Sequence, residues 1–355
     1  MRIIQILPTM AYGDAVGNNT LAIGEMLRQN GYETAIYAEN IDGRLPAKTV
    51  KHVDQYREQD GDVVIFHLSI WSRLNELIRG LKAKVIIIYH NVTPPEFFES
   101  YSRDAYELCK KGLEGVKSLA DVPTMCVCDS EFNKQDLIRM GYTCPIEVVP
   151  ILINFDDYKK KADEKVIAQY SDDGYTNLLF TGRVAPNKKQ ENVIKAFYYY
   201  KNYFNPKSRL FIVGSYNESD LYYRRLRAYI DELELNDVIF PGHIPFAQIL
   251  SYYRVADVFV CMSEHEGFCV PLAEAMYFGV PVVAYNTTAV GETLGGSGLL
   301  LEDNNPVVVA EAIDKVIKDE EIKETIIKNE SVRLKDFDNS MIKELLLNKL
   351  KQYID

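Results

Sequence analysis

The chain has 355 residues, of which 47% are hydrophobic and 26% are charged, and this length favours two globular domains over one. The formal net charge of −11 argues against a nucleic-acid-binding protein, because phosphate backbones attract a basic surface. No apolar run is long enough to span a membrane, no export signal is evident, and the six cysteines include no C-x-x-C pair. We therefore expect a cytoplasmic protein with reduced thiols.

The first 155 residues alternate between apolar segments and segments with helical periodicity. The predicted strands are residues 2–8, 32–39, 62–69, 84–91, 124–130 and 146–153, and the helical segments include 18–31 and 72–82. Strands that are apolar on both faces are typical of a parallel sheet covered by helices on both sides. This pattern predicts a Rossmann-like domain over residues 1–155.

A polar, charged segment at 154–177 interrupts the alternation, and we predict that it connects two domains and contains one short helix. The alternation then resumes. The predicted strands are residues 178–184, 208–215, 237–243, 256–263, 281–286 and 298–302, with helices at 190–204, 221–233 and 246–256. A second Rossmann-like domain over 156–339 is therefore predicted, and the amphipathic helix 340–355 is expected to pack back on the first domain.

Two cations follow the first strand of the second domain. Gly182 permits a close approach of the backbone, and Arg183 and Lys188 come just before a helix. Ligands of open α/β sheets bind beyond the carboxyl ends of the strands. Phosphate is attracted by basic side chains and by the N–H groups of a helix N-terminus, so this segment predicts a diphosphate site. For either cation alone, ordinary basic surface is the alternative.

Two glutamates flank the start of a later helix, in the segment SEHEGFCVPLAEAMYFGVP. Glu266 precedes the helix and Glu274 lies about one turn inside it, roughly 5–6 Å along the axis, so both can face one elongated ligand. Glu274 can accept both hydroxyls of a ribose, which leaves Glu266 for a sugar. The backbone amides that can bind phosphate at this helix N-terminus are those of Phe268, Cys269 and Val270.

The combination of Gly-Arg-x4-Lys with Glu-x7-Glu about eighty residues later resembles the retaining glycosyltransferase family 4, within the glycosyl transferases group 1. The resemblance covers the second half of the chain, including residues 241–264, and more loosely the first half. It implies the α/β GT-B fold, in which two doubly wound parallel-sheet domains face each other across a cleft. Cys269 departs from the family pattern, which often has glycine there.

The resemblance also implies roles for single residues. Arg183 and Lys188 would bind the donor diphosphate, Glu274 the ribose and Glu266 the donor sugar. The residues implied to lie against the nucleotide base are Gly242, His243 and Ile244.

His90 lies at the carboxyl end of a predicted strand of the first domain, and Asn91 follows it. A lone histidine is more often structural than catalytic, but this position leaves both interpretations open. The resemblance implies that a histidine here lies against the donor sugar and the acceptor. His67, at the end of the preceding strand, is a weaker candidate on the same argument.

The loop between the first strand and the first helix contains Gly13 and Gly17, with Asn18 next. Glycines here allow a close approach of the backbone to a phosphate or sugar, and the resemblance implies that this loop shapes the donor and acceptor cleft. Ordinary turn glycines are the alternative. The spacing lacks the G-x-G-x-x-G pattern of a dinucleotide-dependent oxidoreductase.

Two Asp-x-Asp pairs have a spacing that a metal-dependent transferase would use. Asp60 and Asp62 precede their strand, on the wrong edge of the sheet, and the pair at 336 and 338 lies near the final helix. We therefore expect no metal and no cofactor, with basic side chains neutralising the departing diphosphate.

These features together predict a metal-independent, retaining hexosyltransferase. The donor would be a nucleoside-diphosphate sugar of the GDP-mannose or UDP-hexose type, and the acceptor a saccharide or lipid-linked saccharide in the synthesis of surface polysaccharides and glycoconjugates. A sugar-nucleotide epimerase on the same fold and a catalytically silent sugar-nucleotide-binding subunit are the alternatives. Basic residues between 73 and 117 are interpreted as solvated helix faces, with peripheral contact to the inner face of the cell membrane as the alternative.

Overall fold

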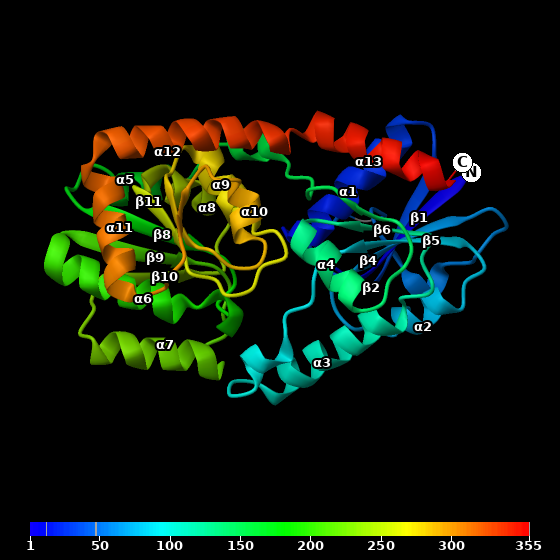
Figure 1. Ribbon diagram of the computed structural model, residues 1–355, viewed down its shortest axis with the longest axis horizontal. Helices are drawn as coiled ribbons and strands as arrows, with labels where there is room; N and C mark the ends of the chain where they lie inside the picture. Colours follow the sequence, from blue (N-terminus) through cyan, green and yellow to red (C-terminus); the bar gives the residue numbers. More distant parts are fainter. Residues whose placement is uncertain (12, 47, 355) are drawn as a thin grey trace. The chain divides into compact units, whose positions relative to one another are not determined.

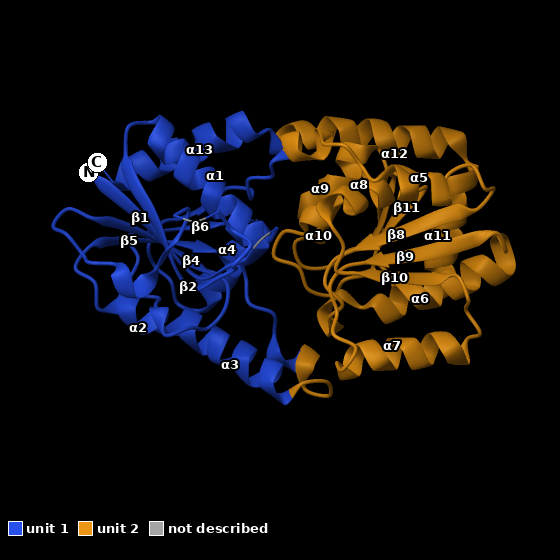
Figure 2. Ribbon diagram, turned by 180° about the vertical axis from the view of Figure 1, so that it is seen from behind, with its two compact units in different colours: residues 1–96, 103–154, 337–355 blue, residues 97–102, 155–336 orange. Residues whose placement is uncertain are grey.

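The computed structural model describes residues 1–11, 13–46 and 48–354, which form two compact units (Figures 1 and 2). Unit 1 comprises Met1–Glu96, Arg103–Asn154 and Phe337–Asp355, and unit 2 comprises Phe97–Ser102 and Phe155–Asp336. The chain thus makes a short excursion into unit 2 at residues 97–102, which the sequence did not indicate. Asp355, the last residue of the predicted C-terminal helix, lies outside the described residues.

The described part of unit 1 contains a seven-stranded parallel sheet in the order β3-β2-β1-β4-β5-β6-β7. Its strands are β1 (Arg2–Met10), β2 (Glu33–Ile41), β3 (Lys51–His52), β4 (Val63–Leu68), β5 (Lys84–Tyr89), β6 (Met125–Cys128) and β7 (Ile146–Val148). The strand order reverses between β1 and β4, and ligands of doubly wound sheets bind beyond the carboxyl ends at such a point.

Helices accompany this sheet in unit 1. They are α1 (Ala15–Gln29), α2 (Leu74–Arg79), α3 (Arg103–Ser118), α4 (Glu131–Arg139) and α13 (Asn339–Ile354), with the 3-10 turns η1 (Val53–Gln55) and η2 (Pro95–Phe98). α1 begins earlier than predicted because the Asp14 carboxylate accepts a hydrogen bond from the N–H of Gly17 at 3.3 Å and caps the helix. α13 contacts α1, and Lys349 of α13 forms an ion pair with Glu147 at 2.8 Å.

The core of unit 1 lies around its central strands, and all six residues of β4 are buried. This explains the uniformly apolar strands of the sequence, since both faces of the sheet are covered. The predicted strand 146–153 was too long, because β7 ends at Val148. Pro150 has no N–H with which to continue the ladder, although Ile151 and Ile153 remain buried in the segment that follows.

The described part of unit 2 contains a six-stranded parallel sheet in the order β10-β9-β8-β11-β12-β13. Its strands are β8 (Thr176–Thr181), β9 (Ser208–Val213), β10 (Val238–Gly242), β11 (Val258–Cys261), β12 (Val282–Tyr285) and β13 (Leu299–Leu301). The order reverses between β8 and β11, so the predicted diphosphate and glutamate segments follow the two strands at the switch point.

The helices of unit 2 form two layers (Figure 1). They are α5 (Glu164–Tyr170), α6 (Gln190–Tyr199), α7 (Leu221–Glu232), α8 (Phe246–Val255), α9 (Val270–Phe278), α10 (Val290–Leu294), α11 (Pro306–Lys318) and α12 (Glu320–Arg333). The 3-10 turns are η3 (Phe155–Lys159), η4 (Pro186–Lys188) and η6 (Leu334–Phe337), and the π-helical segment η5 (Tyr200–Phe204) follows α6 directly. α6 contacts α7 and α11 in one layer, and in the other α8 contacts α5 and α9, which also contacts α12.

The predicted class of two Rossmann-like, doubly wound parallel-sheet domains is therefore confirmed. The connection at 154–177 contains both η3 and α5, where one short helix was expected, and α10 to α12 were not predicted individually. Within the described ranges, no helix combines the length and the apolar character needed to cross a membrane.

Candidate active site

Two loops meet at the carboxyl edge of the sheet in unit 2. The loop at 182–189 follows β8, and the loop at 262–269 follows the neighbouring strand β11. The N–H of Glu264 donates to the carbonyl of Asn187 at 2.9 Å, and the Asn187 side-chain amide donates to the carbonyl of His265 at 3.1 Å. These bonds hold the two loops in a fixed relation.

Lys188 and Glu266, one from each loop, form an ion pair with 2.5 Å between Nζ and Oε2. The Glu266 side chain is 7% exposed and that of Lys188 is 24% exposed. Burial lowers the pKa of Lys188, but Glu266, together with the nearby Cys269 and Cys261, raises it by more, so the net pKa lies above its ordinary value. The N–H of Glu266 also donates to Thr288 Oγ1 at 3.0 Å, which ties this loop to the segment after β12.

Arg183 lies in the same loop as Lys188 but has a different environment. Its side chain is exposed and makes no ion pair with any residue that the structure describes. Gly182 before it has φ +144°, and a Cβ added at Gly214 would lie 1.9 Å from the Gly182 carbonyl oxygen. The loops after β8 and β9 are therefore in direct backbone contact. Because the Arg183 side chain is exposed, it is available to bind an anion.

Glu274 lies inside α9 and accepts hydrogen bonds from two tyrosines. The Tyr158 hydroxyl donates to Oε1 at 2.8 Å and the Tyr253 hydroxyl to Oε2 at 2.6 Å. Burial raises the pKa of Glu274, and the two hydrogen bonds lower it by less, so its net pKa lies above the ordinary value. A carboxylate has about four lone-pair positions, so two remain for the hydroxyls of a ligand. The tyrosines were missed because they lie 116 and 21 positions away in the sequence.

Phe268 and Cys269 directly precede α9, and the binding of phosphate by their amides and by that of Val270 stays a prediction. α9 begins at Val270, and Cys269 adopts a left-handed conformation with φ +74°. Glycine adopts that conformation without steric cost, which gives a physical reason for glycine in the family pattern. The Phe268 carbonyl accepts a hydrogen bond from Thr293 Oγ1, which orients the turn before the helix.

Gly242 ends the edge strand β10, and His243 and Ile244 follow it. The strand is separated from β8 by β9, so these residues lie along the same edge of the sheet but further out. A Cβ added at Gly242 would lie 3.5 Å from the ring of Tyr216, which stacks on Tyr223 at 4.1 Å between centroids. This aromatic pair was not predicted, because the two tyrosines lie outside any motif.

In unit 1, four polar side chains form a hydrogen-bonded chain across the central strands. Gln5 of β1 contacts His67 of β4, with 3.0 Å between Oε1 and Nε2. His67 Nδ1 lies 3.0 Å from His90 Nε2, and His90 Nδ1 lies 2.9 Å from Asp129 Oδ2. The two rings are stacked, with 3° between their planes. His90 and His67 are thus brought together with Gln5 and Asp129, which the sequence did not single out.

The proton positions in this chain follow from Gln5. Its amide Nε2 donates to the carbonyl of Thr20 at 3.1 Å, so its oxygen faces His67 and His67 Nε2 is the donor. The three links then need three protons, of which two neutral imidazoles supply two. The third is shared between His90 and Asp129. Burial, and then the neighbouring His90, hold the pKa of His67 well below its ordinary value, so the additional proton does not reside there.

Asn91 directs its side chain into unit 1. Its Nδ2 donates to Asn133 Oδ1 at 2.7 Å and to Asp136 Oδ2 at 3.3 Å, both on α4. Its backbone has φ +75°, a conformation that asparagine tolerates better than most residues. These contacts give Asn91 a structural role in joining the segment after β5 to α4.

Gly13, Gly17 and Asn18 lie at the start of α1. Gly13 has φ +74°, and a Cβ added to Gly17 would lie 2.9 Å from the carbonyl oxygen of Ala11. Gly17 therefore permits close packing of the helix on the end of β1, whereas Gly13 permits the turn. Asn18 is exposed in the first helical turn. The turn-glycine interpretation thus has a direct structural basis, and the contribution of this loop to ligand binding stays a prediction.

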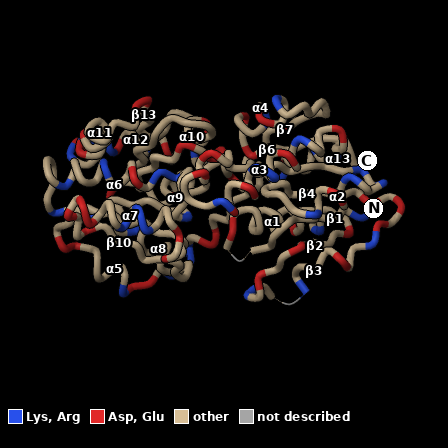
Figure 3. Tube along the Cα trace, turned by 90° about the horizontal axis from the view of Figure 1, so that it is seen from below, with Lys and Arg blue, Asp and Glu red and all other residues tan. Residues whose placement is uncertain are grey.

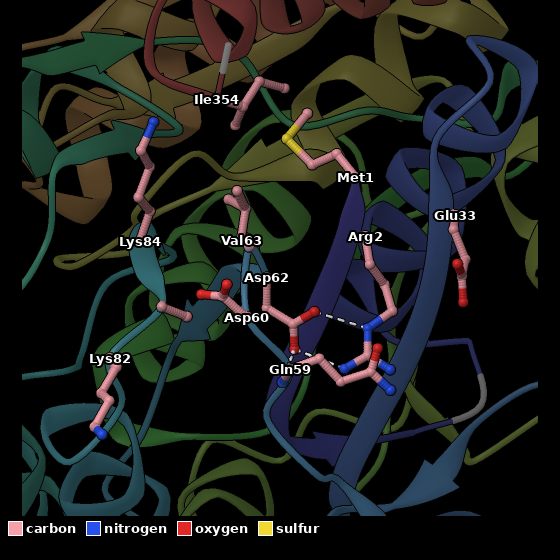
Figure 4. A pocket seen from close by; sticks show the side chains of 12 residues that line it. Met1, Arg2, Glu33, Gln59, Asp60, Asp62, Val63, Lys82, Lys84 and Ile354 are labelled. Carbon is pink, nitrogen blue, oxygen red and sulfur yellow. Dashed lines mark hydrogen bonds and ion pairs between the residues drawn. The ribbon is translucent and has the colours of Figure 1, made fainter.

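A pocket of about 610 Å³ lies at the amino ends of the strands of unit 1 (Figure 4). His67 and His90 are at the opposite, carboxyl edge of that sheet. Asp62 in this pocket forms hydrogen bonds to Arg2 Nε and Nη2, both at 2.7 Å, and accepts one from the Tyr56 hydroxyl at 3.0 Å. Burial raises the pKa of Asp62, but Arg2 and the other donors lower it by more, so the net pKa is below its ordinary value. Asp62 therefore contributes to folding at this edge of the sheet.

The second Asp-x-Asp pair is also engaged in local structure. Asp336 forms an ion pair with Arg333 at 2.8 Å, and Asp338 accepts a hydrogen bond from the N–H of Ser340 at 2.9 Å. Among the described residues, one group of three side chains of the metal-binding type has its ligand atoms within 4.8 Å of one another. It consists of Cys261, Glu266 and Cys269, which the sequence spacing did not indicate.

The three arginines between residues 73 and 117 have acidic partners, and Figure 3 shows the two signs of charge interspersed along both units. Arg73 pairs with Glu39 at 2.7 Å, and Arg79 pairs with Asp121 at 2.9 Å. Paired charges of this kind support the interpretation as solvated helix faces.

The comparisons with known proteins follow the same division of the chain. The family model for glycosyl transferases group 1 matches residues 162–333, almost the whole of unit 2. The O-antigen chain mannosyltransferase B of Escherichia coli is 24% identical over 246 residues, which are 68% of this chain and 63% of that protein. The D-inositol 3-phosphate glycosyltransferase of Corynebacterium jeikeium is 26% identical over 220 residues, 58% of this chain and 52% of that protein. The matches thus span little more than half of these relatives.

Solved structures match over nearly the full chain. Anabaena Alr3699/HepE, in a complex with UDP and glucose, has a TM-score of 0.79 at 18% identity, covering 99% of this chain and 100% of that chain. WaaG, a glycosyltransferase involved in lipopolysaccharide biosynthesis, has a TM-score of 0.72 at 14% identity, with 97% and 98% coverage. At such identities the likeness establishes the fold, and it confirms the predicted GT-B class. Residues 162–333 therefore belong to the glycosyl transferases group 1, and the chain has the GT-B fold.

Proposed function

We propose that this protein is a glycosyltransferase that moves a hexose from a nucleoside-diphosphate sugar to a saccharide or lipid-linked saccharide. The observation that carries the proposal is the Lys188–Glu266 pair at the carboxyl ends of β8 and β11, with the exposed cation of Arg183 in the same loop. A buried ion pair with one partly open cation suits a ligand that carries both phosphate and hydroxyl groups.

Lys188 and Arg183 take the role of stabilising negative charge on the departing diphosphate, together with the amides at the start of α9. Such electrostatic stabilisation is usually the largest single contribution to catalysis of this type. The raised pKa of Lys188 supports this role, because it keeps the ammonium charged in a partly buried setting. Glu266 orients Lys188 and presents its carboxylate to the hydroxyls of the donor sugar.

Glu274 takes the role of ribose anchor. The two tyrosine hydroxyls hold its carboxylate in one orientation, so little rotamer entropy is lost when a ribose binds. The stacked pair of Tyr216 and Tyr223 beside Gly242 offers a flat apolar surface for the nucleotide base. The base itself, whether guanine or uracil, is left to the experiment below.

The reaction proposed is a front-face substitution with retention. The bond between the anomeric carbon and the phosphate oxygen breaks, and a bond from the acceptor hydroxyl oxygen forms on the same face. The proton of that hydroxyl passes to the departing phosphate oxygen. Lys188 and Arg183 neutralise the diphosphate without a metal ion, and the carboxylate of Glu266, already bound to Lys188, is not assigned as a covalent nucleophile.

We assign the acceptor to unit 1. Both ring nitrogens of His90 are engaged inside that unit, so we treat the histidine as a positioning residue that fixes the segment after β5. A lipid-linked acceptor would bring the protein to the inner face of the cell membrane from the cytoplasm. The ion-paired arginines between 73 and 117 give this membrane contact only weak support.

The experiment is a thermal-shift panel of the purified chain against UDP-, GDP-, ADP- and dTDP-sugars in the presence of a chelator. A ligand at a hundredfold excess over its Kd stabilises the folded state by about 2.7 kcal/mol, so a true donor is visible. We expect one nucleotide class to raise the transition temperature, and Glu274→Gln to reduce that shift. The conservative glutamine keeps partners for both tyrosine hydroxyls, which makes it a better probe than alanine.

Product analysis separates the alternatives. A transferase yields the free nucleoside diphosphate and a glycosylated acceptor, whereas an epimerase changes the sugar without needing an acceptor. Binding without turnover in the presence of candidate acceptors would favour the silent subunit. A response to NAD(P) with none to any sugar nucleotide would overturn the proposal.

A further inference from the structure

Two cysteines lie against the Lys188–Glu266 pair. Cys261 is the last residue of β11 and Cys269 precedes α9, and both are buried. Their sulfur atoms are 4.0 Å apart, and Cys261 Sγ lies 3.5 Å from Ser263 Oγ. The left-handed backbone of Cys269 (φ +74°) sets the direction of its side chain. The proposed roles above use neither thiol.

The carboxylate of Glu266 completes a group of three. One ligand atom from each of Cys261, Cys269 and Glu266 lies within 4.8 Å of the others. A tetrahedral zinc site with Zn–S bonds of about 2.3 Å places its two sulfurs about 3.8 Å apart. The observed separation of 4.0 Å is therefore close to that of an occupied site, and little movement is needed to bind an ion.

We propose that Cys261, Cys269 and Glu266 form a binding site for one thiophilic divalent cation, with Zn²⁺ as the type, and with a fourth position open. Two sulfur ligands favour borderline and soft cations over Mg²⁺ and Ca²⁺, which prefer oxygen. The site differs from the metal role that the sequence analysis considered and set aside, because it does not involve an Asp-x-Asp pair or the diphosphate.

The charges of the occupied site balance. Two thiolates and the Glu266 carboxylate carry three negative charges, and a divalent cation with the Lys188 ammonium carries three positive charges. With both thiols protonated, the empty site is balanced too, because Lys188 is paired with Glu266 at 2.5 Å. Because a carboxylate has two oxygens, Glu266 can bind the cation through one while it accepts from Lys188 through the other. Neither state buries an uncompensated charge, which would be costly.

Occupation of this site would exclude the donor. This step rests on the proposed function, in which Glu266 binds the donor sugar and the amide of Cys269 faces phosphate. A cation bound to Glu266 and Cys269 takes both groups away from the nucleotide sugar. The metal would therefore act as an inhibitor that competes with the donor and would take no part in transfer.

The test uses Co²⁺ as a spectroscopic probe on the full-length, reduced protein. Thiolate ligation of Co²⁺ gives an intense charge-transfer absorption, which we expect to saturate at one ion per chain and to disappear when Zn²⁺ is added. In Cys261→Ser we expect the affinity to fall at least about 100-fold, since even loss of a residue behind a ligand costs 10–100-fold. The Ser263 hydroxyl near this position gives the new hydroxyl a partner. Cys269→Gly, which suits the left-handed backbone, provides a second variant should Cys261→Ser fold poorly.

Cys144→Ser is the matched control, because Cys144 and Cys126 form a second thiol pair, 3.6 Å apart, in unit 1. The charge-transfer band should survive this change. A band that is lost in Cys144→Ser but kept in Cys261→Ser and Cys269→Gly overturns the proposal, and so does the absence of a band in the wild type. Glu266→Gln should weaken Co²⁺ binding, and an unchanged affinity would remove Glu266 from the site.

Competition with the donor is measured separately. The nucleotide sugar found in the thermal-shift panel should displace Co²⁺ in proportion to its occupancy. If it binds without displacing the metal, the inhibitory role is wrong. If no nucleotide sugar binds while the Cys261-dependent band is present, the proposed function fails and the metal site stands.

Discussion

The two units arrange the polar side chains of their central strands and of the loops after them in different ways. In unit 1, Gln5 and His67 belong to strands, His90 and Asp129 follow strands directly, and each contacts the next. In unit 2, Lys188 and Glu266 come from loops of several residues, and those loops are joined by their backbones. Strand positions give a rigid and closed arrangement, whereas loops allow side chains to reach a ligand.

Exposure separates the two charged pairs. The side chains of His90 and Asp129 are 3% and 5% exposed, while Lys188 is 24% exposed beside Glu266 at 7%. The pair in unit 2 thus has an open cation and the pair in unit 1 is sealed. We infer that side chains of unit 2 stabilise the charge of the departing diphosphate directly. The hydrogen-bonded side chains of unit 1 instead fix the position of the backbone after β5.

The largest effect is expected for Lys188→Ala. Removal of one electrostatic donor to a developing anion typically costs on the order of 10²–10³ in rate, so kcat/KM should fall by that factor. Initial-rate measurements with the donor identified by thermal shift would give the value. Arg183→Ala should show a loss in the same range, and losses below threefold for both variants would remove the diphosphate assignment.

Lys189→Ala is the control for this experiment. Lys189 is adjacent in sequence, but its ammonium pairs with Glu264 at 3.1 Å and lies 5.6 Å from the centre of the Phe97 ring. Its backbone is already left-handed at φ +50°, so alanine adds no new strain. We expect a change in kcat/KM of less than about threefold, in the range of a surface ion pair. Equal losses at 188 and 189 would show that the loop responds as a whole.

Glu330 differs from Glu266 and Asp129 because it is a buried carboxylate that forms no ion pair within the described residues. It lies on α12 and accepts one hydrogen bond, from the N–H of Val282 at 2.9 Å. Burial raises its pKa to about 8. The folded state therefore binds a proton that the unfolded state releases between about pH 4.5 and pH 8, and stability falls as the pH rises through that window.

Glu330→Gln should remove this dependence. One unit of pKa corresponds to about 1.4 kcal/mol, so the variant should be more stable than the wild type by roughly 2–4 kcal/mol at pH 8 and about equal at pH 5. Urea unfolding at the two pH values gives the difference. Glu324→Gln, an exposed position on the same helix, should follow the wild type at both. If the stability of Glu330→Gln changed with pH in the same way as that of the wild type, the Glu330 carboxyl would not be protonated in the folded state.

Asp129→Asn tests the sealed pair in unit 1. The asparagine can keep a hydrogen bond to His90 Nδ1 but carries no charge, so unit 1 loses a charge-assisted hydrogen bond worth about 2 kcal/mol. We expect the free energy of unfolding to fall by this amount and kcat/KM to change by far less than in Lys188→Ala. Asp121→Asn, in an exposed pair with Arg79, should change stability by less than about 0.5 kcal/mol. If Asp129→Asn had a stability close to that of the wild type and a hundredfold lower rate, the hydrogen-bonded side chains of unit 1 would have a catalytic role.

Much of the fold was predictable because it depends on local patterns. Uniformly apolar strands separated by helical periodicity gave both parallel sheets, and the break at residues 154–177 separated them. Errors occurred where one residue overrides the pattern. Pro150 ends β7 early, and the Asp14 cap starts α1 early.

The candidate site was predictable only in part. Lys188 and Glu266 could be assigned to one ligand site because each follows a strand at the switch point and the family resemblance joined the two motifs, but their ion pair was not predicted. Partners such as Gln5 and Tyr158 have no motif, and only the fold brings them to His67 and Glu274. The sulfur pair could not be predicted either, because the eight-residue spacing of Cys261 and Cys269 is not a metal-binding motif. The fold brings the two sulfur atoms together by placing the end of β11 next to the start of α9.

The smallest effect on the donor site is expected for Tyr158→Phe. This substitution tests how far that site depends on the connecting segment at residues 154–177. Tyr158 lies in η3 and donates to Glu274 at 2.8 Å, while its ring packs against Phe155 and Tyr277, contacts that phenylalanine retains. Loss of one hydrogen bond costs about 1 kcal/mol, so the donor Kd should rise about fivefold. The Tyr158 hydroxyl also lowers the pKa of Glu274, whose net pKa is already raised by burial. Without it, a larger fraction of the carboxyl is protonated in mildly acidic solution.

The loss of donor affinity should therefore grow as the pH falls, which a purely structural effect of the substitution would not produce. Isothermal titration calorimetry at pH 6 and pH 8 with the identified nucleotide sugar measures both values. Tyr277→Phe is the matched control, because its ring lies 5.3 Å from that of Tyr158 and its hydroxyl is not bonded to Glu274 in the described contacts. An equal loss at both pH values would mean that Tyr158 supports the site by packing alone. The carboxylate of Glu274 would then be oriented mainly by Tyr253, from within the sheet-and-helix core of unit 2, and would not depend on the connection between the units.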